Sequence, residues 1–78
     1  MRCAVISRAG QVLANGRLLV HQTESGDLRL DLATDGGRLL EGGLIDADGD
    51  MSEASQGLSE RFFEVWGMSD LILQVTVR

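Results

Sequence analysis

One segment, residues 50–67 (DMSEASQGLSERFFEVWG), carries the only clear helical pattern in the chain and constrains the fold more than any other feature. Its apolar residues recur every three to four positions, which places them on one face of a helix. They are Met51, Ala54, Leu58, Phe62, Val65 and Trp66. The other positions are mostly polar, so the pattern predicts a helix over residues 51–66 whose apolar face enters the core.

The ends of this helix have recognisable signals. Asp50 followed by Glu53 has the form of a capping box, and Ser52 is a rival N-cap. Gly67 follows the last apolar residue and can adopt the left-handed conformation that ends helices. Gly57 is a weak point, because glycine inside a helix costs roughly 1 kcal/mol relative to alanine. We therefore expect fraying before Leu58.

The rest of the chain consists of short apolar runs separated by turn residues, which is typical of strands. The expected strands are residues 2–7, 11–14, 17–22, 28–33, 38–45 and 71–77. Asn15-Gly16 is the strongest hairpin signal. The alternative interpretation is one strand over residues 11–22 with a bulge at Gly16.

Side-chain alternation indicates which way the later strands face. Leu28, Leu30 and Leu32 point inward, while Arg29 and Asp31 point to solvent, as in an antiparallel strand with one wet face. Gly42-Gly43 interrupts the next strand and indicates a bulge or a loop. The last strand is rich in β-branched residues and is expected to pair inside the sheet.

These elements predict an α+β fold in a single small domain, residues 1–78. The expected architecture is a four- or five-stranded antiparallel sheet (a meander) with one helix packed on one face and a C-terminal strand. One helix covers only one face of such a sheet. The open face would carry Leu19, His21 and Ile72 among polar residues. These side chains are either scattered exposed residues, which are normal, or parts of a contact surface.

No catalytic or cofactor chemistry is predicted. Asp46, Asp48 and Asp50 have the alternating spacing of a calcium loop, but Met51 and Gly57 stand where such a loop needs glycine and glutamate. We expect an acidic turn there and no metal. Cys3 and His21 lie on separate predicted strands, so no catalytic pair is expected. The glycine-rich residues 36–43 lack the lysine of a phosphate loop.

Size, charge and hydropathy argue against several further classes of protein. A chain of 78 residues with one cysteine has no intrachain disulfide to support its small core. Its net charge of −5 argues against direct binding of nucleic acid, which depends on lysine and arginine. No apolar run approaches the ~18 residues of a membrane span, and the N-terminus lacks the pattern of a signal peptide. We expect a cytoplasmic protein, in the host cytoplasm if it is viral.

The candidate contact residues lie on two surfaces. The first is the side of the helix outside the apolar stripe, which suits a basic partner and carries Glu60, Glu64 and Phe63. The second is the open sheet face, which carries Leu19 and Ile72. In size, charge and order of elements the chain resembles small phage-encoded inhibitors, including some anti-CRISPR proteins. We expect a non-catalytic protein-binding module, and the resemblance implies an inhibitor of a larger complex. The alternative is a homo-oligomeric structural or assembly subunit joined through edge strands.

Overall fold

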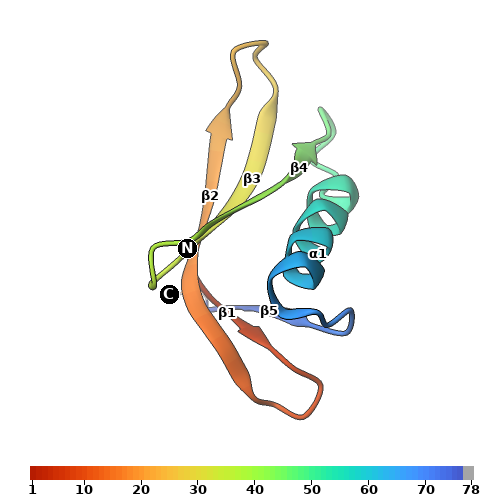
Figure 1. Ribbon diagram of the computed structural model, residues 1–78. Helices are drawn as coiled ribbons and strands as arrows, with labels where there is room; N and C mark the ends of the chain where they lie inside the picture. Colours follow the sequence, from red (N-terminus) through yellow and green to blue (C-terminus); the bar gives the residue numbers. More distant parts are fainter. Residues whose placement is uncertain (77–78) are drawn as a thin grey trace.

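The computed structural model describes residues 1–76 and shows a five-stranded antiparallel sheet with one helix packed on it (Figure 1). The α+β class predicted from the sequence is confirmed. The elements in chain order are β1 (Arg2–Ile6), β2 (Val12–Gln22), β3 (Leu28–Thr34), β4 (Leu39–Ile45), α1 (Ser52–Trp66) and β5 (Ile72–Val75). The predicted last strand included Val77, which lies outside the described residues.

The strands lie in the order β4-β3-β2-β1-β5. The first four form a meander, and α1 then returns the chain to the other edge, where β5 pairs antiparallel with β1 (Figure 1). The expectation that the last strand pairs inside the sheet was therefore wrong, because β5 is an edge strand. The alternation of apolar residues in β5 indicates that one side of the strand faces the core. It does not indicate whether a second strand pairs with the outer side of β5.

β2 runs straight through Asn15-Gly16, so the hairpin predicted there was wrong and the single-strand alternative was right. Gly16 lies in the middle of the ladder, opposite Cys3 on one side and Thr34 on the other. A Cβ atom on this glycine would lie 2.3 Å from the carbonyl oxygen of Ala33. The absence of a side chain at Gly16 therefore allows β2 and β3 to approach each other closely. The register with β1 shifts near Leu13 rather than at Gly16.

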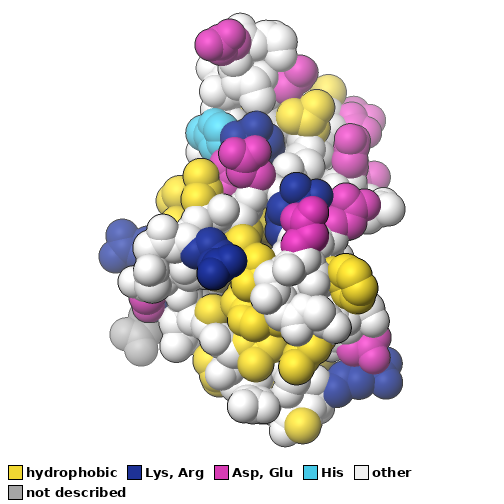
Figure 2. Space-filling view, viewed as in Figure 1, with side chains coloured by type: hydrophobic (Ala, Val, Ile, Leu, Met, Phe, Trp, Pro, Cys, Tyr) yellow, Lys and Arg dark blue, Asp and Glu magenta, His cyan; other side chains and the backbone are white. Residues whose placement is uncertain are grey.

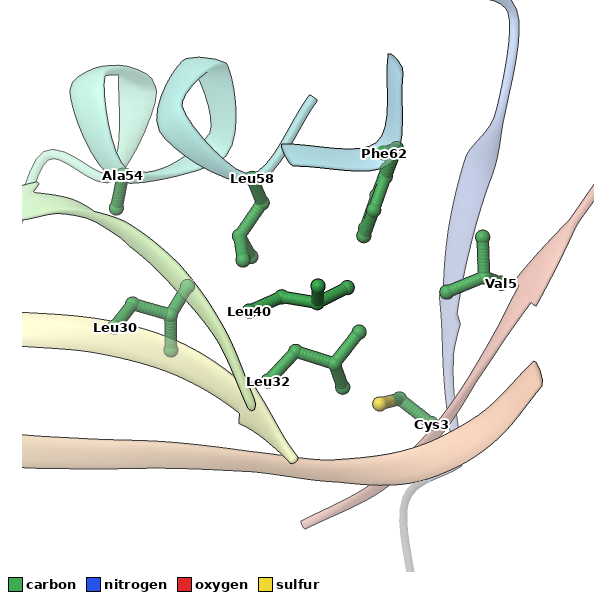
Figure 3. Close-up of a cluster of buried hydrophobic side chains, with 8 residues drawn as sticks. All are labelled: Cys3, Val5, Leu30, Leu32, Leu40, Ala54, Leu58 and Phe62. Atoms are coloured by element: carbon green, nitrogen blue, oxygen red, sulfur yellow. The ribbon is translucent and has the colours of Figure 1, made fainter. Parts of the chain in front are cut away.

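The core forms where the apolar stripe of α1 meets the sheet. Ala54, Leu58 and Phe62 are the buried residues of the helix, as predicted. They point toward side chains from three strands of the sheet, β1, β3 and β4 (Figure 3), namely Cys3, Val5, Leu30, Leu32 and Leu40. Each fully buried leucine, valine or phenylalanine contributes about 1.5–3 kcal/mol of gross transfer free energy. This cluster is therefore the main source of stability.

α1 packs closely against β4 because glycines line both sides of the contact. A Cβ atom on Gly57 would lie 2.5 Å from the backbone nitrogen of Gly43 and 2.9 Å from the carbonyl carbon of Gly42. The helix is continuous through Gly57, so the fraying expected there does not occur. The predicted bulge at Gly42-Gly43 is confirmed by a register shift between β3 and β4.

The ends of α1 follow the sequence only in part. Gly67 has φ 68° and its N–H donates to the carbonyl of Phe63, which confirms the predicted C-terminal signal. At the start, Met51 occupies the N-cap position without a side-chain cap, so the predicted capping box does not form. The Asp50 carboxylate instead accepts from the hydroxyl and the N–H of Ser52, at 2.6 and 2.9 Å. These two bonds lower the pKa of Asp50.

Candidate functional site

Three of the predicted contact residues, Glu60, Phe63 and Glu64, come together on the outer face of α1. Phe63 is 58% exposed, although burial would stabilise so large an apolar side chain. It is one helical turn from Glu60 and next to Glu64 in sequence, and the side chains of both glutamates are also exposed. The three line a shallow hollow of about 470 Å³, together with Gln56, Ser59, Arg61 and Ser69.

Arg61 modifies the electrostatics of this hollow, and the sequence reasoning missed its role. Its Nε atom lies 3.0 Å from a carboxylate oxygen of Glu64, and its Nη2 atom lies 3.7 Å from one of Glu60. The two glutamates therefore share a cation and do not simply repel each other. Exposed pairs of this kind contribute only about 0–1 kcal/mol, so a partner can replace Arg61 at little cost.

A second hollow adjoins the first and carries the acidic surface onto β4. Its volume is about 420 Å³, and Gln56, Glu60 and Arg61 border both hollows. Glu41 and Glu53 add two further carboxylates to its rim. We call the combined surface the acidic helix face, defined by Glu41, Glu53, Glu60, Phe63 and Glu64. Figure 2 shows acidic side chains gathered over the region of α1, with few basic ones between them.

Leu19 and Ile72 lie on the opposite face of the sheet and do not belong to this surface. Their exposed fractions are 42% and 56%. Arg17 pairs with Arg2 and Ile72 pairs with Ile6. Leu19 thus stands six residues from Ile72 along the strand direction, or about 20 Å. The structure does not bring the two together, so the open face is not one continuous apolar surface.

An ion pair crosses the sheet between these two positions. The guanidinium of Arg2 donates from both terminal nitrogens to the Asp35 carboxylate, at 2.9 and 2.8 Å. Arg2 belongs to β1, whereas Asp35 follows β3, so the pair spans β2 on the side away from α1. The hydrogen bond from Arg2 holds the pKa of Asp35 below its usual value.

Asp31 forms a second polar cluster on this face, and its environment was not predicted. The sequence placed Asp31 in solvent, but the residue is only 3% exposed. Its carboxylate lies 2.6 Å from His21 Nε2 and 3.2 Å from Arg29 Nε, and it accepts the N–H of Gly42 at 3.2 Å. The prediction of its direction was right and that of its exposure was wrong, because neighbouring side chains cover it.

The Asp31 cluster has the chemistry of a structural ion pair. A buried carboxylate needs several donors, and His21, Arg29 and Gly42 supply them. Cys3 faces the core on the other side of the sheet, so it does not pair with His21. Burial raises the pKa of the Cys3 thiol, which keeps it protonated and unreactive.

The acidic turn before α1 uses its carboxylates within the chain. Asp46 accepts the N–H of Asp48 at 3.3 Å, and Asp50 is held by Ser52. Gly49 has φ 83°, which closes the turn. Within residues 1–76, no group of three or more histidine, cysteine or acidic side chains is arranged to hold a metal ion.

Comparisons with protein-family models, with curated proteins and with solved structures found no match to this chain. Across the described residues, no helix has the length and apolar character needed to cross a membrane.

Proposed function

We propose that the protein is a non-catalytic binding module that docks a basic segment of another protein on its acidic helix face. The observation that carries the proposal is the exposed Phe63, which lines one hollow together with Glu60 and Glu64. In a soluble protein such an aromatic side chain, rimmed by charges, is typical of an interface.

The chemistry of this surface suits an arginine-bearing partner. A guanidinium can stack on the ring of Phe63 while its N–H groups donate to the flanking carboxylates. Arg61 already occupies part of this position, with its Nε 3.0 Å from Glu64. An incoming arginine would compete for the same oxygens. The additional carboxylates of Glu41 and Glu53 would attract a partner with several basic residues.

The resemblance in layout to small phage-encoded inhibitors suggests how such binding would act. A domain of this size blocks a basic surface of a larger complex by covering it, without any reaction. The complex would be cytoplasmic, in the host cell if the protein is viral. Because the basic surface is engaged through carboxylates, binding should weaken as salt concentration rises.

The test compares tagged variants in quantitative affinity capture from a lysate of the native host. Phe63→Ala and the double variant Glu60→Arg/Glu64→Arg should lose the partner that the unchanged protein retains. With the purified partner, Phe63→Ala should weaken binding about 30-fold, since a central aromatic anchor contributes on the order of 2 kcal/mol.

The matched control is Glu24→Arg/Asp48→Arg, which makes the same change of charge on two exposed turns outside the residues that define the acidic helix face. This control should retain the partner. The proposal is refuted when the helix-face variants and the control capture the same proteins in equal amounts. Circular dichroism of each variant checks that the fold is kept.

A further inference from the structure

The two edges of the sheet differ in how they are protected. β4 carries the Gly42-Gly43 bulge and the charged Glu41, and α1 packs against it. β5 has none of these three devices: its register with β1 is regular, residues 71–76 (LILQVT) contain no charge and no proline, and the backbone of α1 makes no close contact with it. No other described strand pairs with its outer side. Natural proteins usually protect an exposed edge with charges, prolines or bulges, so an unprotected edge indicates a pairing surface.

The backbone of β5 presents a defined set of free hydrogen-bonding groups. The N–H of Thr76 donates to the carbonyl of Arg2 at 2.9 Å. Bonding direction alternates along an antiparallel strand, so Gln74 and Ile72 also face β1. The N–H and C=O groups of Leu73 and Val75 therefore point outward. Four polar groups in a row are available to an added strand.

We propose that this edge pairs antiparallel with the β5 strand of a second copy of the chain. A two-fold axis at Gln74 places Leu73 opposite Val75 of the partner subunit, and Val75 opposite Leu73 of the partner subunit. Each of these pairs exchanges two hydrogen bonds, so all four outward groups of both copies are satisfied. The edge is thus complementary to itself, as a two-fold interface requires.

The side chains of β5 support the same pairing. Leu73 and Val75 lie opposite Val5 and Cys3, so they face the side of the sheet that carries α1. With Leu18, Leu58 and Phe62 they line an apolar groove of about 360 Å³ that reaches the β5 edge. Pairing would bring the Leu73 and Val75 side chains of the two copies into contact and close the outer end of each groove.

Charge favours a second copy over a charged partner at this position. The charges near β5 are already paired: the side chains of Arg8 and Asp70 are 4.0 Å apart, and Arg2, which lies opposite Thr76, donates to Asp35. The carboxylates of the acidic helix face lie on α1 and β4, away from β5. The edge itself is short, with four residues in β5. It therefore buries less than the roughly 1,200–2,000 Å² of a stable interface, and a weak dimer is expected.

The test is sedimentation equilibrium of the unchanged chain from micromolar concentration to about 1 mM, the range in which an association of about −4 to −8 kcal/mol is visible. We expect a monomer–dimer equilibrium. Val75→Pro should abolish the dimer, because it removes an outward N–H, which an edge strand tolerates. Its melting temperature should change little. A chain that stays monomeric throughout the range overturns the proposal and leaves the edge to a strand of another protein.

Gln74→Cys tests the register without depending on the proline variant. Two cysteines at this position would face each other across the axis as a non-hydrogen-bonded pair, with Cα atoms about 4.5 Å apart, within disulfide reach. We expect a disulfide-linked dimer on mild oxidation. Gln56→Cys, an exposed glutamine on α1, is the matched control and should stay monomeric. Equal cross-linking of both variants, or none of Gln74→Cys, overturns the register. The helix-face variants leave this result unchanged, so the two proposals fail separately.

Discussion

The close contact between α1 and β4 predicts that Gly57→Ala destabilises the domain, whereas helix propensity alone predicts that it stabilises the domain. Gly57→Ala places a methyl group 2.5 Å from the backbone nitrogen of Gly43 and 2.9 Å from the carbonyl carbon of Gly42. Both neighbours are backbone atoms, so no side-chain rotation relieves the clash. The helix must move away from β4. Leu58, which is 2% exposed, would move with it.

The two effects of this change oppose each other. Replacing glycine by alanine inside a helix stabilises it by about 1 kcal/mol. Overpacking costs about 1–3 kcal/mol, and a clash against rigid backbone belongs at the upper end of that range. The expected net result is a loss of about 2 kcal/mol. For a domain of this size that corresponds to a fall of roughly 8–16 °C in melting temperature.

Urea denaturation followed by circular dichroism measures the free energy of unfolding of Gly57→Ala. The control is Ser55→Ala, an exposed position of the same helix. It should be slightly stabilising, by up to about 0.5 kcal/mol, because it gains propensity without a clash. A Gly57→Ala protein that is more stable than the unchanged chain would refute the close backbone contact.

Three further predictions concern the core and the polar clusters. Phe62→Ala should destabilise the domain by about 3–5 kcal/mol in a thermal or urea melt, since it empties the centre of the core. Asp31→Ala should cost about 2 kcal/mol by the same measurement, because it removes the acceptor shared by His21, Arg29 and the N–H of Gly42. Asp35 has a lowered pKa in the folded state, so its ion pair stabilises the protein above the unfolded pKa and loses that effect as pH falls through the folded value. Asp35→Asn should therefore be less stable than the unchanged chain at pH 7, with a difference that disappears in acid; a constant difference would show that the ion pair is not the cause.

The glycines show why part of the fold could be predicted and part could not. Gly67 was read correctly, because a helix end is a local feature with its own sequence signal. Gly16 and Gly57 were misread as a turn and a weak point, since each is required by a segment distant in sequence. Ala33 approaches Gly16 from β3, and Gly42-Gly43 approaches Gly57 from β4. No pattern within a single element reports such contacts.

The candidate site shows the same division between local and distant information. Helical periodicity was enough to place Phe63 off the apolar stripe, beside Glu60 and Glu64. The burial of Asp31 could not be inferred, because it depends on His21 in β2 and on a backbone N–H in β4. The separation of Leu19 from Ile72 depends on strand order, which alternation does not contain.

The pairing of β1 with β5 has a consequence for how the chain folds. Cys3 and Val75 are partners in the sheet although 72 positions separate them (75 − 3), whereas β2, β3 and β4 join neighbours through short turns. Closing so long a loop costs more entropy and slows folding, so β5 should dock after the meander has formed. The amides of β5 should therefore exchange with solvent sooner than those of β2 and β3. Because β5 covers one side of β1, a transient release of β5 would uncover the edge of β1 without unfolding the meander.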